Sequence, residues 1–237
     1  MSAPISSNYG SQVFGAWRAD CAHAWHAYTH HAFVEGLRDG SLAHSAYLHY
    51  LIQDYVFLMH YSRTWALAVV KSQTRDEMRL SASIVNGLIN HEIQLHIGVC
   101  AREGVCEDQL FAAEEELENL AYTRYVMDSG LAGDFLDMMA ALSPCVFGYG
   151  EIGARLKLTG VKNNRYQEWI DTYADPEYQT LCEQAAKLIE TAAADRIGTD
   201  STLSPRWSSL CKRFSTATRL ERGFWDMGLR ARCNDAE

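Results

Sequence analysis

Proline is scarce in this sequence, and that scarcity favours long uninterrupted helices. Only four prolines occur among 237 residues, about a third of the usual share. Because proline lacks a backbone donor and breaks helices, its rarity permits them. No segment of useful length alternates apolar and polar residues in the manner of a strand. We therefore expect an all-α protein.

The chain also lacks the features of exported, membrane-spanning and nucleic-acid-binding proteins. No run of about 18 apolar residues is present to cross a bilayer. The first residues, Met1–Pro4, have neither the charged nor the apolar part of a secretory signal. The formal net charge of -9 disfavours nucleic acid and anionic membranes as partners. These absences predict a soluble, cytoplasmic protein.

The cysteines suggest neither a disulfide framework nor a zinc site. They are odd in number and scattered, with no Cys-x-x-Cys pair. Such usage is typical of a reducing compartment. The seven positions are Cys21, Cys100, Cys106, Cys145, Cys182, Cys211 and Cys233.

Apolar residues recur at three- and four-residue steps along most of the chain, which predicts a bundle of about eight helices. We expect one domain over residues 1–237, with flexible ends at 1–8 and 231–237. The predicted helices cover about 9–31, 44–72, 74–101, 107–129, 132–158, 163–173, 176–196 and 203–230.

The most unusual stretch is Met139–Gly153, an apolar helix interrupted by Pro144 and followed at once by Cys145. The proline removes one helical hydrogen bond and kinks the helix. Tyr149 comes one turn after Cys145 on the same face, and Gly148 is expected to leave room beside them. A thiol, a phenol and open space can form a pocket wall. A cysteine in an apolar helix is nevertheless more often a small buried hydrophobe.

Two carboxylates occur where the helical pattern predicts burial. Asp54 is in register with the aromatic residues of its helix, and Glu221 lies one turn before Trp225. A buried carboxylate needs partners, since an unpaired one is costly. Two other interpretations of Asp54 stay open: an exposed position at the edge of its helix, or a structural ion pair. Arg219 and Arg222 could instead keep Glu221 at the surface.

Histidines at helical spacing raise the question of a metal site. They form two groups, His23, His26, His30 and His31 in one helix, and His91 and His96 beside Glu92 in another. Helical di-iron sites use Glu-x-x-His pairs on two facing helices, whereas His91 and Glu92 are adjacent. The predicted helices at 132–158 and 163–173 contain no histidine. We expect no metal, and we expect His23 and His26 to be surface or capping residues.

Five segments, taken in order, resemble the TenA (thiaminase II) family in its cysteine-containing subclass. They are Tyr50–Asp54, Ala121–Thr123, Ala140–Gly153, Tyr166–Tyr173 and Glu221–Met227. Each is weak alone, but together they extend over about 13–230. His31–Val34 also looks like the end of the family's first helix. The resemblance implies the heme-oxygenase-like helical fold, a homotetramer, and no metal or organic cofactor.

The same resemblance implies an activity and a set of site residues. The family hydrolyses 4-amino-5-aminomethyl-2-methylpyrimidine, and thiamin, to the hydroxymethylpyrimidine during thiamin salvage. By correspondence Cys145 is the nucleophile and Glu221 the acid/base. The implied substrate contacts are Asp54, Phe57, Tyr122, Tyr149 and Tyr173. At position 57 the family usually has a tyrosine, whose hydroxyl is expected to increase the nucleophilicity of the cysteine. This chain has Phe57 there and so lacks that hydroxyl.

Two other functions stay open from the sequence. One is a catalytically silent protein that keeps the pocket and either binds a pyrimidine or has a regulatory role. The other is a metal-dependent oxygenase on the same fold, which would need the metal ligands argued against above. The sequence does not decide between thiamin and the aminomethylpyrimidine as substrate.

Overall fold

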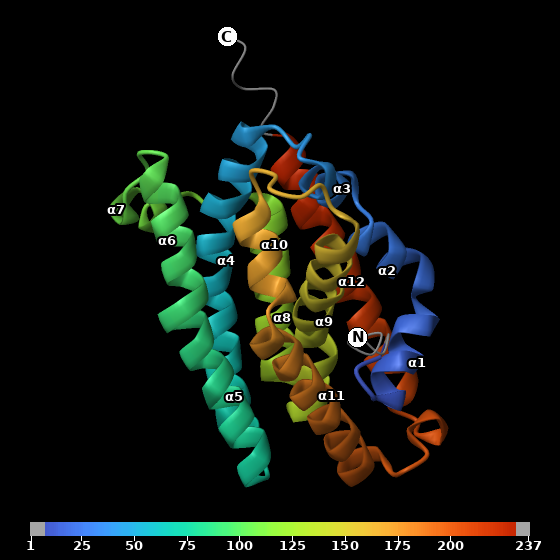
Figure 1. The fold of residues 1–237 in the computed structure, drawn as a ribbon. Helices are drawn as coiled ribbons and strands as arrows, with labels where there is room; N and C mark the ends of the chain where they lie inside the picture. Colours follow the sequence, from blue (N-terminus) through green and yellow to red (C-terminus); the bar gives the residue numbers. More distant parts are fainter. Residues whose placement is uncertain (1–7, 231–237) are drawn as a thin grey trace. The chain divides into compact units, whose positions relative to one another are not determined.

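The computed structural model describes residues 8–230, and every regular element in that range is a helix (Figure 1). The prediction of an all-α protein is confirmed. Where eight helices were expected, the described residues form twelve α-helical segments. Three predicted helices are interrupted, and one short helix at Ala32–Asp39 was not expected. No helix within 8–230 is long and apolar enough to cross a membrane.

The contacts divide the chain into two compact units, described here one at a time. Within the described residues, unit 1 comprises 8–42 and 136–222, and unit 2 comprises 43–135 and 223–230. The prediction of one domain over residues 1–237 stays a prediction. The ends expected to be flexible, at 1–8 and 231–237, lie outside the described residues apart from Asn8.

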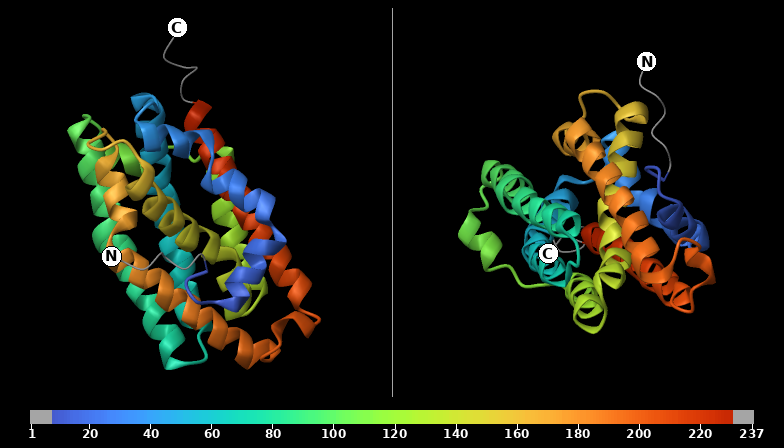
Figure 2. Two further views of the ribbon diagram at one scale, coloured as in Figure 1. Left: turned by 45° about the vertical axis from the view of Figure 1, so that its right-hand side comes forward. Right: turned by 90° about the horizontal axis from the view of Figure 1, so that it is seen from below.

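Unit 1 is built on an aromatic core. Phe14 contacts Phe147 with ring centroids 4.0 Å apart, and Phe214 stacks on Trp25 at 5.6 Å. Figure 2 shows α11 in orange beside α1 in blue, in agreement with their contacts. Its helices are α1 (Gln12–Asp20), α2 (Ala22–Thr29), α3 (Ala32–Asp39), α9 (Phe135–Thr159), α10 (Gln167–Ala174), α11 (Pro176–Ile197) and most of α12 (Trp207–Arg230), with a 3₁₀ turn at Ser201–Leu203.

The helix expected at 9–31 is interrupted once and ends two residues before its predicted end. Cys21 separates α1 from α2, and His30 ends α2. The His31 side chain then accepts a hydrogen bond from the Phe33 amide and so caps the start of α3. The interpretation of His31–Val34 as a helix end is therefore wrong, because these residues begin one.

Unit 2 is organised around α4 (His44–Lys71), which packs against α5, α6, α7 and α8 (Figure 1). The helix expected at 74–101 begins as predicted, with Thr74 as its cap, but a π-helical turn interrupts it at Leu88–Glu92. The helix expected at 107–129 is broken at 112–116. The resulting elements are α5 (Arg75–Gly87), α6 (Ile93–Arg102), α7 (Glu107–Phe111), α8 (Leu117–Ala132) and the last residues of α12.

Pro144 lies inside α9, as predicted, but Gly148 does not leave room beside it. The Tyr28 ring fills that space, and a methyl group built at position 148 would overlap it. The Tyr28 hydroxyl donates to the Pro144 carbonyl across 3.5 Å. The expected open space is a close approach between α2 and α9, which only glycine permits.

We predict that Gly148→Ala lowers the free energy of unfolding, by about 1–3 kcal/mol or more, because the new methyl group overpacks the contact with Tyr28. Gly98→Ala in α6 is the matched control. No heavy atom lies within 4 Å of a methyl group built there, so alanine should raise the free energy of unfolding by about 0.4–1 kcal/mol. Urea unfolding measures both changes. Equal effects of the two substitutions would contradict the assignment.

Candidate active site

Cys145 is the only residue between Phe135 and Gly150 that is not buried. It is half-buried, directly after Pro144 in α9, while every side chain around it in the sequence is enclosed. The residue predicted as the nucleophile is therefore the least enclosed one of this segment. Its role as the nucleophile stays a prediction.

Burial makes most of the other described cysteines unsuitable as the nucleophile. It raises the pKa of Cys182 to about 12, of Cys211 to about 11 and of Cys100 to about 11, since an apolar surrounding disfavours the thiolate. Cys21 is also buried, with its pKa raised. Cys106 is exposed, and none of the six described cysteines is in a disulfide. The thiolate is the nucleophile, so burial disfavours Cys21, Cys100, Cys182 and Cys211.

Tyr149 and Tyr173 are brought together in unit 1, as a shared pocket requires. Their ring centroids lie 4.8 Å apart in an edge-to-face arrangement, and Trp169 contacts both. Gly153 makes this possible, because a methyl group there would be 2.5 Å from the Tyr173 carbonyl carbon. The close approach of α10 to α9 thus sets these aromatic rings one turn beyond Cys145.

Glu221 is buried, with 2% of its surface exposed. Arg219 and Arg222, which were considered able to hold it at the surface, are themselves exposed. The surface alternative is therefore wrong. A buried carboxylate in α12 has the enclosed environment that an acid/base group needs.

Asp54 is buried in α4 of unit 2, with 2% exposed, so the exposed-edge alternative is wrong. Its Oδ2 accepts a hydrogen bond from the Tyr50 hydroxyl at 2.9 Å and lies 2.7 Å from Nε2 of His96. The structural ion pair considered from the sequence is present at this oxygen. Both of these contacts are made by Oδ2, and Oδ1 takes part in neither.

His96 is the site residue that the sequence did not predict. Its Nδ1 lies 2.9 Å from the Glu92 carbonyl oxygen and its Nε2 faces Asp54. Both neighbours are acceptors when Asp54 is ionised, so both ring nitrogens must carry protons. Burial opposes the charge, but the hydrogen bond and charge of Asp54, with Glu92, outweigh it and raise the pKa of His96. His96 and Asp54 therefore form a buried pair that favours the protonated imidazole.

A local feature of the chain helps to place this histidine. The π-helical turn ends at Glu92, four residues before His96. Such turns are rare and frequently lie at functional sites. The signal for His96 in the sequence was its place in the group of His91, Glu92 and His96, which was considered as a possible metal site. His91 is exposed, whereas His96 is buried against Asp54.

Phe57 and Tyr122 also meet within unit 2. Their ring centroids are 5.0 Å apart, and Phe57 contacts Tyr61 at 5.1 Å and Phe224 at 5.5 Å. Phe57 is thus part of an aromatic wall, as predicted. The effect of its missing hydroxyl stays a prediction.

The other histidines considered as metal ligands are not gathered around a site. His23 and His26 are exposed, as predicted, and the His26 ring stacks on His30 at 4.3 Å. Over residues 8–230 no three His, Cys, Asp or Glu side chains are grouped to hold a metal ion.

We predict that the pair makes stability depend on pH. The pKa of His96 is raised above its ordinary value of 6.5, so its contribution is complete below that pH and is lost as the pH rises through the raised pKa. The free energy of unfolding should fall by up to about 1.4 kcal/mol per pH unit in that window. His96→Gln should lack this fall, while His23→Gln, an exposed control, should keep it.

Urea unfolding across this pH range measures the effect, and ¹⁵N NMR of the imidazoles reads the protonation directly. An unprotonated ring nitrogen on His96 at pH 6 would contradict the imidazolium assignment.

Comparisons with known proteins show which family this chain belongs to. The model of the TENA/THI-4/PQQC family matches residues 18–231. An aminopyrimidine aminohydrolase from Halalkalibacterium halodurans is 33% identical over 210 residues, 88% of this chain and 91% of the relative. The crystal structure of a TenA family transcription regulator from Silicibacter sp. is 53% identical, with a TM-score of 0.92, over 94% of this chain and 99% of that one.

A more distant structure shows the fold alone. A domain of unknown function from Shewanella denitrificans, described as having a heme oxygenase-like fold, is 11% identical with a TM-score of 0.68 over 91% of each chain. The fold expected from the resemblance is confirmed. The chain belongs to the TENA/THI-4/PQQC family.

Proposed function

We propose that this protein hydrolyses 4-amino-5-aminomethyl-2-methylpyrimidine, and thiamin, to 4-amino-5-hydroxymethyl-2-methylpyrimidine by cysteine catalysis. Its enzyme class is hydrolase, the class of its relatives named aminopyrimidine aminohydrolase. The observation that carries the proposal is Cys145, the one residue that is not buried in the stretch from Phe135 to Gly150 of α9.

The thiolate of Cys145 adds to a carbon of the electron-poor pyrimidine ring, and a ring nitrogen takes a proton from Glu221. The electron pair of the broken aromatic system then expels the protonated amine from the neighbouring methylene, and it leaves as neutral ammonia. Water adds to the methylene and releases one proton to the solvent, Glu221 recovers its own proton from the ring nitrogen, and the carbon–sulfur bond breaks. One difficult displacement becomes two easier steps, and the balance is substrate plus water to alcohol plus ammonia.

The remaining residues bind the ring. Asp54 pairs with the amino edge through Oδ1, since Oδ2 is committed to Tyr50 and His96, and its charge strengthens that bond. The family resemblance implies Tyr149 and Tyr173 of unit 1, and Phe57 and Tyr122 of unit 2, as further substrate contacts, and aromatic rings suit a flat ligand. The homotetramer implied by the family resemblance is likewise a proposal.

We expect limiting iodoacetamide to abolish hydrolysis by alkylating Cys145. Alkylation consumes the thiolate that would add to the ring. Peptide mapping of all seven cysteines, with activity measured in parallel, reports which modification tracks the loss. Cys106 is the internal control, because it is exposed and should react without loss of activity. Full activity after complete alkylation of Cys145 would make another group the nucleophile.

Glu221→Gln should lower kcat by about 10²–10⁴, the usual range for a positioned acid/base, with a smaller change in KM. The amide keeps the shape of the buried side chain but carries no transferable proton. Arg219→Gln, two residues away and exposed, is the control and should turn over normally. Near wild-type kcat in the Glu221 variant would remove this residue from the mechanism. Pyrimidine binding by the wild type without any turnover would favour a silent binding protein instead.

A further inference from the structure

Gln53, the residue before Asp54, has an unusual set of partners for a side chain in the middle of a long helix. It is 4% exposed. Its Nε2 donates to the Glu114 carbonyl at 2.8 Å, and its Oε1 accepts from the Glu116 amide at 3.1 Å. One amide thus binds the middle and the last residue of the short break between α7 and α8. This contact explains why the helix expected at 107–129 is interrupted there.

Asn119, on the first turns of α8, completes the arrangement. It is fully buried. Its Nδ2 donates to the backbone carbonyl of Gln53 at 2.8 Å and to Oε1 of Gln53 at 3.1 Å. We call these four hydrogen bonds the Gln53–Asn119 clamp. Because the groups are buried, each bond is costly to break, since water cannot replace the lost partner.

The clamp lies one helical turn before a pair of proposed substrate contacts. Phe57 follows Gln53 by four residues on α4, and Tyr122 follows Asn119 by three on α8. Residues three or four apart share a helix face. The two rings meet at 5.0 Å, directly after the point where the clamp fixes the two helices.

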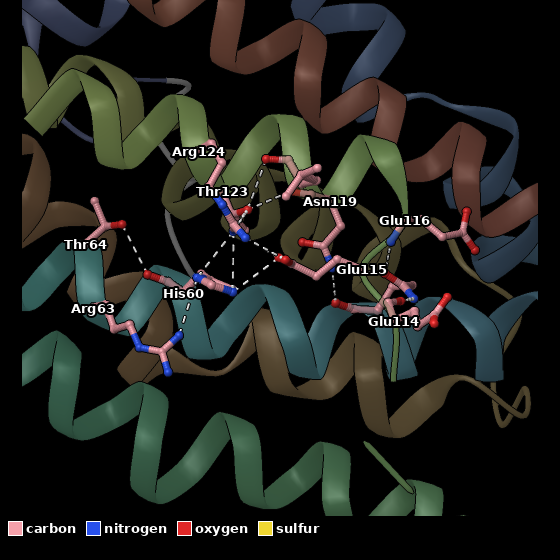
Figure 3. Close-up of polar contacts among 11 residues, drawn as sticks. His60, Arg63, Thr64, Glu114, Glu115, Glu116, Asn119, Thr123 and Arg124 are labelled. Atoms are coloured by element: carbon pink, nitrogen blue, oxygen red, sulfur yellow. Dashed lines mark hydrogen bonds and ion pairs between the residues drawn. The ribbon is translucent and has the colours of Figure 1, made fainter. Parts of the chain in front are cut away.

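A second set of polar contacts joins the same elements at the surface (Figure 3). His60 of α4 lies 3.2 Å from Glu115, and Arg124 of α8 binds both Glu115 oxygens at 3.0 and 2.7 Å. Exposed ion pairs contribute little to stability because water and salt screen them. This set, with 49% of the Arg124 side chain exposed, therefore offers a matched control for the clamp.

We propose that Gln53 and Asn119 are positioning residues, which hold Tyr122 on α8 against Phe57 and next to the helix that carries Asp54. This rests on the proposed function, under which these side chains contact the pyrimidine. Neither Gln53 nor Asn119 needs to touch the substrate. The clamp also explains why a glutamine precedes Asp54, since its amide supplies a donor and an acceptor together.

The test uses two mild variants of the full chain. Gln53→Glu keeps the acceptor but loses the donor to Glu114, and Asn119→Ser loses the amide that reaches Gln53. Arg124→Gln removes the surface ion pair as the control. Far-UV circular dichroism and melting curves come first, and all later measurements are made below the lowest melting temperature. Each variant acts on one side of the clamp, so either folded one is sufficient for the test.

The first readout is independent of activity. 3-Fluorotyrosine placed at position 122 gives a ¹⁹F resonance that depends on the ring of Phe57. It should shift or broaden in the clamp variants and stay unchanged in Arg124→Gln. An unchanged resonance in a folded clamp variant, or an equal change in the control, would overturn the proposal.

The second readout is kinetic. KM for the aminopyrimidine should rise by about tenfold in the clamp variants, because a displaced substrate contact loses its interactions. The rate of Cys145 alkylation should stay within about twofold of wild type, since the thiol itself is untouched. A shifted ¹⁹F resonance with unchanged KM would mean that Tyr122 does not bind substrate. Failure of wild-type hydrolysis would overturn the proposed function and leave the ¹⁹F test of the clamp standing.

Discussion

A buried histidine that faces an acceptor at each ring nitrogen can satisfy both only by carrying two protons. His96 is in this position, between the Glu92 carbonyl and Asp54. His96 gives Asp54 a partner in a surrounding where a lone carboxylate would be strongly disfavoured. It also engages Oδ2 together with Tyr50, so the direction of the remaining oxygen is fixed. The aromatic register of α4 can therefore include a charge without exposing it.

In unit 1 the constraint is packing, not charge. Tyr28 fills the space beside Gly148, and Gly153 lets α10 approach until Tyr173 meets Tyr149. Because protein interiors are close-packed, a helix covered in this way is closed to ligands along most of its length. Cys145 is the exception, and the proposed chemistry needs a thiol that is enclosed on most sides yet open to a small molecule.

Phe57 stands where the family resemblance implies a tyrosine, and it brings no hydroxyl into the buried aromatic cluster around it. Phe57 packs against Tyr61, Tyr122 and Phe224, a setting where a hydroxyl would need a partner of its own. The wall is retained without that requirement. The polar bonds that order this part of unit 2 come instead from Gln53 and Asn119, outside the aromatic contact.

The sequence by itself determined the helical class and the helix that carries Pro144, and it indicated that Asp54 shares a face with aromatic residues. Each of these is recorded locally, in the spacing of apolar residues or in the chemistry of proline. The order of five motifs also determined the family. The boundaries of α4 and α11 were predicted to within one residue.

Only the tertiary structure decided which partner each buried group has. His96 and Asp54 are 42 residues apart, and Tyr28 reaches Pro144 over 116. The break at 112–116 likewise depends on Gln53, more than 60 residues earlier. Periodicity shows which face of a helix is turned inward. It does not show which helix that face meets, and the satisfaction of a buried polar group, or the filling of a glycine's free space, depends on that neighbour.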